Sequence, residues 1–223
     1  MHYLRSITLI ILVARLSAAG WLDLAQRSSA PDIASDMRAL ASVMAVPAGD
    51  FLYTFGHVAY LHHFIPLSAG GVGQVQRVGF AVQPIPEWVF TAQLWSAPSN
   101  YPVVGYGMGA NYIWFFQGRN RWSFGVQNNE LRGQNTFSQR NLSLTQQYTR
   151  VFFGSVFHLQ ATYDMEKTVY VDLPNLTNHE RNYWLFSGVL SKNLFNDLQL
   201  DVCLIFNKTR PAGRVGLNWG IGN

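Results

Sequence analysis

The stretch from Val103 to Phe116 constrains the fold of this 223-residue chain more than any other. Taken every second residue, one face is apolar and rich in aromatic side chains: Val104, Tyr106, Met108, Ala110, Tyr112, Trp114 and Phe116. The other face begins Gly105, Gly107, Gly109, Asn111 and turns apolar at Ile113 and Phe115. A β-strand, with a period of two, separates these sets, whereas a helix would mix them. The stretch predicts a strand long enough to cross a membrane, which takes about nine to eleven tilted residues.

The composition agrees with a barrel that alternates apolar side chains outward with polar side chains inward. Charged residues make up 13% of the chain, against about 25% in typical soluble domains, and aromatic residues make up 14%. A mean hydropathy of +0.04 does not suit a helical membrane protein, whose long apolar runs would raise it. A soluble lipocalin-like binding protein is the alternative; it would need no outward aromatic band.

The N-terminus predicts a signal peptide over residues 1–19. Arg5 provides the positive charge, residues 7–14 form an apolar core, and Ser17-Ala18-Ala19 offers small residues for cleavage after Ala19. Removing Arg5 and Arg15 leaves 14 basic minus 12 acidic residues, a net charge of +2. The basic pI is therefore weak evidence for an anionic partner, and no nucleic-acid partner is expected.

Residues 20–50 predict an N-terminal helical segment distinct from the strands. Pro31 can open a helix, and an apolar stripe follows at helical spacing: Ile33, Met37, Leu40, Ala41 and Met44. Pro47 and Gly49 end the pattern, so the helix is expected over about 31–46. It could plug the barrel, contact a partner or pack on the barrel end.

The rest of the chain, 51–223, alternates strand patterns with turn residues. Strands are expected at 51–63, 73–83, 87–95, 103–116, 121–130, 148–163, 167–173, 181–191, 195–206 and 213–221. The connections between them alternate between longer and shorter, with a dominant surface loop at about 131–147. Long outer loops and short periplasmic turns are typical of a bacterial barrel with an even strand count. Ten strands fit; eight is the alternative if the weak strand at 167–173 is lost.

On this pattern, residues 51–223 resemble a small Gram-negative outer-membrane β-barrel protein. The last strand, with Val215, Leu217, Trp219 and Ile221 on one face, is similar to the terminal signal by which such barrels are recognised, although Gly222 and Asn223 follow it. The resemblance implies an all-β, antiparallel, up-and-down transmembrane barrel in the cell outer membrane. Outer-membrane lipid and the barrel assembly machinery are its implied partners.

No strong catalytic motif is present, and neither a cofactor nor a metal is expected. His57, His62 and His63 lie close together, but neighbouring strand residues point to opposite faces, so a shared metal ion requires the strand to end there. Interfacial or loop histidines are the simpler interpretation.

A charged set is expected to line the lumen, because arginine or lysine facing lipid at the midplane costs about 2–4 kcal/mol. The set is Arg77, Glu87, Arg150, His158, Asp197 and Asp201. It could form an internal salt-bridge network, a solute-selective constriction, or an acid–base site with His158 near a carboxylate.

The resulting hypothesis is a non-enzymatic outer-membrane barrel. It would act either as a narrow solute channel or as a structural or interaction protein that displays the 131–147 loop to a solute or protein partner. An outer-membrane hydrolase acting on lipid or peptide is the enzymatic alternative. That alternative requires His158 or His57 within hydrogen-bond reach of a serine or a carboxylate at the membrane surface.

Overall fold

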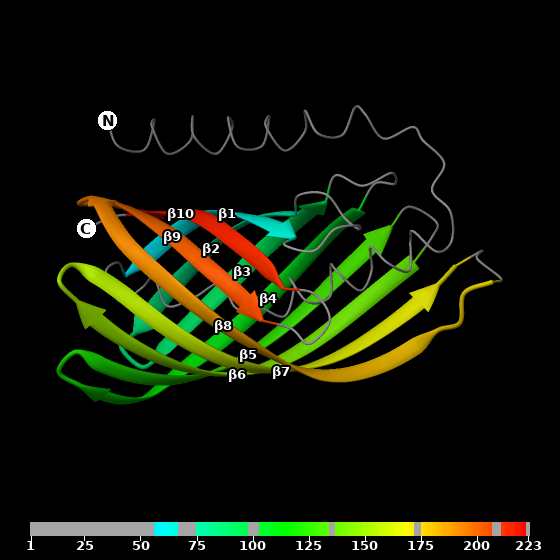
Figure 1. Ribbon diagram of the computed structural model, residues 1–223, viewed down its shortest axis with the longest axis horizontal. Helices are drawn as coiled ribbons and strands as arrows, with labels where there is room; N and C mark the ends of the chain where they lie inside the picture. The colour runs from blue at the N-terminus through cyan, green and yellow to red at the C-terminus, as the bar shows by residue number, and fades with distance from the viewer. Residues whose placement is uncertain are drawn as a thin grey trace.

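The computed structural model describes residues 56–66, 75–97, 103–133, 137–171, 175–206 and 211–221. These residues form one closed antiparallel barrel of ten strands, in which each strand pairs with the next and β1 pairs with β10 (Figure 1). The strands are β1 (His57–Pro66), β2 (Val75–Ile85), β3 (Trp88–Ala97), β4 (Val103–Gln117), β5 (Asn120–Gly133), β6 (Phe137–Phe152), β7 (Ser155–Tyr170), β8 (His179–Phe195), β9 (Leu198–Phe206) and β10 (Ala212–Gly220). The predicted fold class and the count of ten strands are confirmed.

The two ends of the barrel differ in the length of their connections, as the sequence predicts. At one end, here called the short-turn end, only two residues separate consecutive strands: Pro86-Glu87, Gly118-Arg119, Phe153-Gly154 and Asn196-Asp197. β1 begins and β10 finishes at this end. At the opposite end, the long-loop end, the strands are separated by 67–74, 98–102, 134–136, 171–178 and 207–211.

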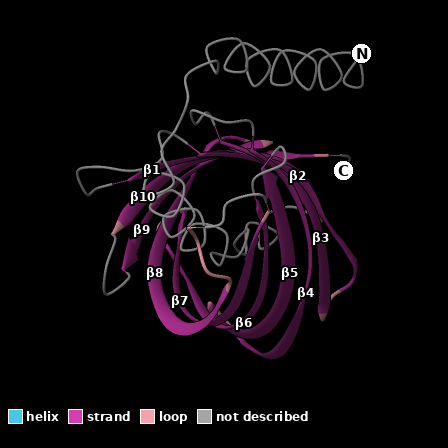
Figure 2. Ribbon diagram, turned by 90° about the vertical axis from the view of Figure 1, so that its right-hand side faces the viewer, coloured by secondary structure: helices cyan, strands magenta, loops and turns pink. Residues whose placement is uncertain are grey.

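The wall of the barrel is not equally long all round. Strands β5 to β8 contain 14, 16, 16 and 17 residues, whereas β9 and β10 contain nine each. About nine to eleven residues suffice to cross a membrane, so this long wall extends past the lipid. Figure 1 shows β7 and β8 projecting beyond the other strands at the long-loop end, and Figure 2 shows the strands as a ring when viewed from that end.

The outer surface is an apolar belt. One large apolar side chain from each of β2 to β10 exposes between 42% and 67% of its surface: Phe80, Phe90, Met108, Phe124, Leu144, Leu159, Phe186, Leu204 and Val215. A soluble protein would not carry such a surface, because contiguous apolar exposure favours association or a lipid environment. This belt argues against the lipocalin-like alternative. No helix in the described ranges is long and apolar enough to span a membrane.

Aromatic rings gather on the outer surface near the short-turn end. Trp88 packs on Tyr112 with ring centroids 5.1 Å apart, and Trp122 packs on Tyr148 at 5.0 Å. Such rings are typical of a membrane–water interface, where their apolar bodies and polar tips are both accommodated. Tyr112 precedes the Gly118-Arg119 turn, so the aromatic part of β4 lies at the short-turn end.

The prediction of a large surface loop at 131–147 is wrong. β5 continues to Gly133, and β6 begins at Phe137 and runs unbroken to Phe152. The segment resembles a loop in sequence because its inward side chains from Gln139 to Gln147 are all polar, as a barrel interior allows. The alternation that identifies it as a strand has little contrast, because the exposed side chains between them are the polar Arg140 and Gln146 as well as Leu142 and Leu144.

The predicted strand over 148–163 is also wrong, because a hairpin turn divides it. Phe152 pairs with Ser155, which leaves Phe153 and Gly154 as a two-residue loop with φ of 41° and 75°. Positive φ at both positions marks a type I′ turn, which favours Asn-Gly. Phenylalanine at the first position hides the turn in the sequence. The predicted strand at 167–173 is mostly the end of β7. The count of ten is nevertheless right, because the sequence predicts a loop where β6 begins and divides β7 into two strands.

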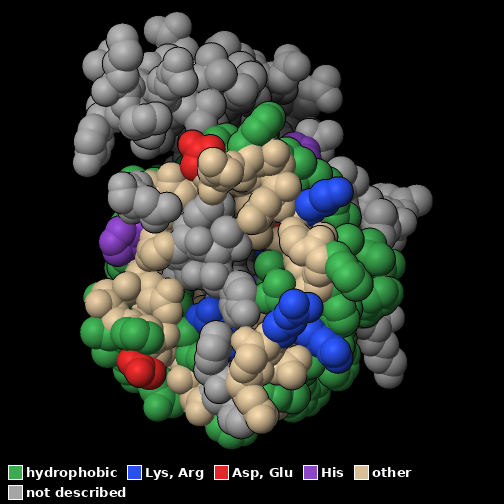
Figure 3. Space-filling model, turned by 90° about the vertical axis from the view of Figure 1, so that its left-hand side faces the viewer, with side chains coloured by type: hydrophobic (Ala, Val, Ile, Leu, Met, Phe, Trp, Pro, Cys, Tyr) green, Lys and Arg blue, Asp and Glu red, His purple; other side chains and the backbone are tan. Residues whose placement is uncertain are grey.

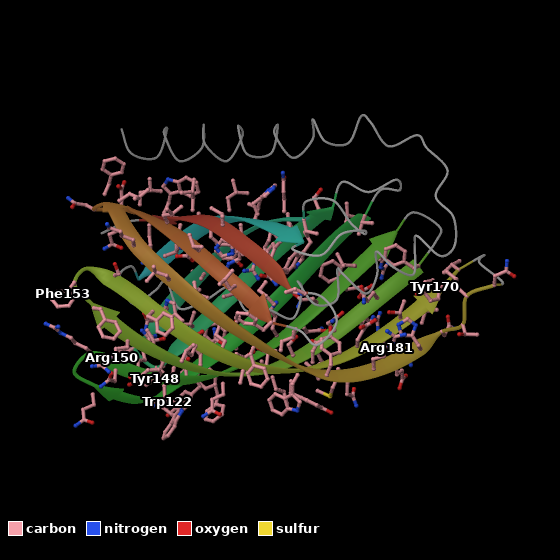
Figure 4. All side chains as sticks on the ribbon, viewed as in Figure 1. Trp122, Tyr148, Arg150, Phe153, Tyr170 and Arg181 are labelled. Atoms are coloured by element: carbon pink, nitrogen blue, oxygen red, sulfur yellow. The ribbon has the colours of Figure 1, made fainter. Side chains whose placement is uncertain are left out.

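We expect Phe153→Asn to stabilise the barrel. Phe153 is fully exposed at the tip of the hairpin (Figure 4) and gains nothing from burial, whereas asparagine tolerates positive φ. Relief of the backbone strain should raise the free energy of unfolding by about 1 kcal/mol, measured by urea unfolding in lipid vesicles. Phe195→Asn, which removes another exposed aromatic ring near a neighbouring turn, is the control and should give no such gain. Equal gains in both variants would contradict this explanation.

The predicted signal peptide at 1–19 and the predicted helix at 31–46 lie outside the described residues, as do Gly222 and Asn223. Both features stay predictions. The same holds for the domain boundary at residue 50.

Candidate functional site in the barrel interior

The interior is crowded where β4 contributes glycines. A side chain at Gly107 would collide with the amide of Asn129 and come within 2.8 Å of Gln93 Nε2. Those two amides bond to each other, with Gln93 Nε2 donating to Asn129 Oδ1 at 2.7 Å. The glycine face of β4 therefore makes room for polar side chains from β3 and β5.

The main charged site, here called the lumen cluster, consists of His62, Arg77, Asp201, Arg214 and Asn218 on β1, β2, β9 and β10. Arg77 Nη2 donates to His62 Nδ1 at 2.6 Å, and His62 Nε2 lies 2.9 Å from Asn218 Oδ1. Because a guanidinium can only donate, Nδ1 must accept, so Nε2 carries the proton and donates to Asn218. The imidazole therefore bridges a cation and an amide as the neutral ring.

Asp201 is the carboxylate of the lumen cluster. Its Oδ2 lies 3.7 Å from Arg214 Nη2 and 3.9 Å from His62 Nε2, and both members of the Asp201–Arg214 pair are almost fully buried. In the strand register, His62 is opposite Gly216, and Gly216 is opposite Asp201. A Cβ on Gly216 would collide with the His62 ring. The missing side chain is what lets the ring lie across β10 toward Asp201.

Aromatic rings surround the guanidinium of Arg77. Its Cζ lies 5.1 Å from the ring centroid of Phe64, 5.0 Å from that of Trp95 and 5.7 Å from that of Tyr60. Desolvated cation–π contacts of this kind contribute up to about 2 kcal/mol. Arg77 is thus held by aromatic faces and by His62 rather than presented to an open pore.

A second polar structure, here called the polar ladder, lines the long wall. Opposite residues of β6 and β7 bond in four successive pairs: Ser143 with Asp164, Thr145 with Thr162, Gln147 with Gln160, and Thr149 with His158. The distances are 2.5, 2.9, 2.7 and 2.9 Å. Asp164 also accepts from Asn141 Nδ2 at 2.6 Å. Hydrogen bonds inside the wall therefore satisfy much of the polar interior.

The structure divides the predicted lumen-lining residues into two groups. Arg77, Asp201 and His158 are buried and face inward; Arg77 and Asp201 belong to the lumen cluster, and His158 belongs to the polar ladder. The remaining three are exposed and the prediction must be corrected for them. Glu87 and Asp197 lie in two-residue turns, and Arg150 lies on the outward face of β6.

These three corrections share one physical reason. All three residues lie at the short-turn end, beyond the apolar belt, where a charge meets water or headgroups and lipid does not force it inward. The space-filling view of this end shows exposed Lys and Arg side chains on it (Figure 3), and Figure 4 shows Arg150 beside Tyr148 near the hairpin tip. Arg150 also covers the Phe152 ring at 4.7 Å.

Sequence reasoning missed several inward residues. Arg214 and His62 alternate with outward residues on their strands, and that signal could have assigned them to the lumen. Asp164 and Glu166 were missed because 164–166 was predicted to be a turn rather than part of β7. His57 and His63 are not buried with His62, and the described residues hold no group of three or more potential metal ligands.

Comparisons with known proteins describe the fold and nothing finer. No protein-family model and no curated protein matches the chain. The chain is similar to the KdgM porin in complex with disordered oligogalacturonate, at 13% identity over 74% of this chain and 99% of that one, with a TM-score of 0.44. It is also similar to the translocator domain of the autotransporter NalP from Neisseria meningitidis, at 12% identity over 86% of this chain and 100% of that one, with the same TM-score. A third similar structure is Ail of Yersinia pestis in complex with the heparin analogue sucrose octasulfate. The identity is 11% over 73% of this chain and 92% of that one, with a TM-score of 0.25.

Likenesses this distant carry no argument about function, so the class rests on the geometry of the chain itself. Each strand of the closed barrel pairs with a neighbour on both sides, and an apolar belt surrounds a polar, hydrogen-bonded interior. A membrane accepts such a sheet only when it is closed, since lipid cannot satisfy backbone groups. The chain has the architecture of an outer-membrane β-barrel protein.

Proposed function

We propose that the protein is a non-enzymatic outer-membrane barrel that acts through its outer surfaces rather than as an open pore. The observation that carries this proposal is the burial of the inward charged side chains. Arg77, His62 and Asp201 each expose 1% or less of their surface. Side chains that line a water-filled channel would be wetted.

The hydrogen bonds within the wall support the same proposal. In the polar ladder, and around His62 in the lumen cluster, donors and acceptors bond to one another, so a passing solute would have to displace those partners. Replacing a buried hydrogen bond with a transient one to the solute is unfavourable. A buried polar group that loses its partner raises the free energy by about 1–3 kcal/mol. A ten-stranded barrel is also little wider than an eight-stranded one, whose interior side chains fill.

We expect the purified full-length protein to give no steady conductance in planar lipid bilayers. The control is Gly188→Ala, a lipid-side substitution that leaves the interior untouched and should be equally silent. Heat-modifiable gel migration would verify that both proteins are folded barrels. A steady conductance in the unmodified protein would overturn the proposal.

The second candidate function is a narrow channel with the lumen cluster as its constriction. Two arginines and one aspartate favour an anionic solute there. If a conductance exists, this candidate predicts that Arg77→Gln lowers its selectivity for chloride over potassium.

The hydrolase alternative gains no support from His158, one of the two histidines it invokes. His158 Nδ1 lies 2.9 Å from Thr149 Oγ1, and the ring is buried on the inward face of β7. A hydroxyl partner of this kind orients the ring but supplies no carboxylate for an acid–base pair.

A further inference from the structure

A row of polar side chains, most of them charged, crosses the outer surface of the barrel from β4 to β8. Five outward residues are successive partners in the strand register from β4 to β8: Tyr106, Glu130, Arg140, Lys167 and Glu180. Arg132 follows Glu130 on the same face of β5. We call Arg132, Arg140 and Lys167 the basic patch.

The two arginines of the basic patch share one carboxylate. Glu130 Oε1 lies 2.6 Å from Arg132 Nε, and Glu130 Oε2 lies 3.2 Å from Arg140 Nε. Tyr106 donates its hydroxyl to Oε2 at 2.8 Å. Both arginines use Nε for these contacts, so the terminal Nη donors of each guanidinium are left for another acceptor.

The arginines are accessible although the carboxylate is covered. The side chains of Arg132 and Arg140 expose 62% and 66% of their surface, whereas that of Glu130 exposes 9%. Lys167, exposed by 61%, donates to Glu180 at 2.7 Å. The basic patch therefore presents three cations side by side, with Glu130 fixing two of them from beneath.

The basic patch lies at the depth of lipid headgroups. On β6, Arg140 and Arg150 both face outward and stand ten residues apart, which matches a strand that crosses the hydrocarbon layer. Outward side chains between them include Leu142, Leu144 and Tyr148. Arg150 is at the short-turn end, so Arg140 marks the opposite boundary of the membrane.

We propose that the basic patch binds the phosphate groups of a lipid headgroup in the leaflet at the long-loop end. Guanidinium groups match phosphate in planar, paired hydrogen bonds, and clustered Arg and Lys at the membrane surface attract anionic headgroups. The acyl chains of the same lipid would lie on the apolar belt below the patch, against Met108 and Leu142, which are exposed by 67% and 41%. This combination of charge and apolar surface fits a lipid better than a soluble anion.

The test uses the full-length protein in detergent and lipid A as the probe, with binding measured by native mass spectrometry. We expect phosphorylated lipid A to bind the unmodified protein and Arg132→Gln/Arg140→Gln to weaken binding by about tenfold or more, since charge-assisted hydrogen bonds are lost. Dephosphorylated lipid A should bind both proteins equally weakly. The matched control is Arg150→Gln, an outward arginine at the other boundary, which should bind as the unmodified protein does.

Equal binding of phosphorylated lipid A by the double variant and the unmodified protein would overturn the proposal. So would equal binding of the phosphorylated and dephosphorylated forms. If the double variant does not fold, Arg140→Gln alone keeps the Arg132–Glu130 pair and should still weaken binding. The result is independent of whether the barrel conducts ions.

Discussion

Replacing Asp201 with leucine is expected to lower the free energy of unfolding by about 3–5 kcal/mol. The substitution removes the carboxylate that faces Arg214 and His62 and leaves a guanidinium buried among apolar and polar groups without its counter-charge. A charge in that position costs far more than the 3.7 Å contact with Asp201 contributes, because burial excludes the water that would otherwise solvate it. Urea unfolding in lipid vesicles, followed by tryptophan fluorescence, measures the loss.

Two further variants make this result interpretable. Asp197→Leu alters an exposed turn aspartate only four residues away and should change the free energy of unfolding by about 0.5 kcal/mol or less. Asp201→Leu/Arg214→Met removes both charges and should recover most of the lost stability, because the buried guanidinium is gone. If the double variant is no more stable than Asp201→Leu, loss of packing rather than an uncompensated charge explains the effect.

Gly216→Ala is expected to destabilise the barrel by about 1–3 kcal/mol through overpacking. The added Cβ would collide with His62 Cδ2 and lie 3.0 Å from its Nε2. The ring cannot swing away cheaply, because Arg77 and Asn218 hold its two nitrogens. Unfolding in the same vesicles measures the effect.

Gly188→Ala is the matched control, since its Cβ would meet only Leu159 Cδ2, at an ordinary 3.9 Å. It should be neutral or stabilise the strand by about 0.5–1 kcal/mol, as alanine loses less backbone entropy than glycine. The effects of Gly216→Ala and His62→Ala on the free energy of unfolding should not add, because removing the ring removes the collision. Strict additivity would show that the His62 ring is not what Gly216 accommodates.

The sequence predicts which way a side chain faces where outward apolar residues alternate with clearly different inward residues along a strand. In β4, apolar and glycine positions differ so clearly that both faces follow from the residues alone. In β6 the contrast is weak, because polar side chains fill the inward face and a polar strand looks like a loop. The turn at Phe153-Gly154 was missed as well, because a phenylalanine gives no indication of the positive φ that the turn requires.

By itself the sequence determined the class of this protein: a two-residue period, few charges and alternating connection lengths leave a membrane barrel as the consistent solution. Only the tertiary structure decided which charges meet. His62 and Asp201 lie far apart in the chain, and closure of β1 onto β10, with Gly216 between them, brings them to 3.9 Å. Register and ring closure are non-local, so no pattern within one strand encodes that contact. The same holds for the basic patch, which forms only because β5, β6 and β7 align their outward residues side by side.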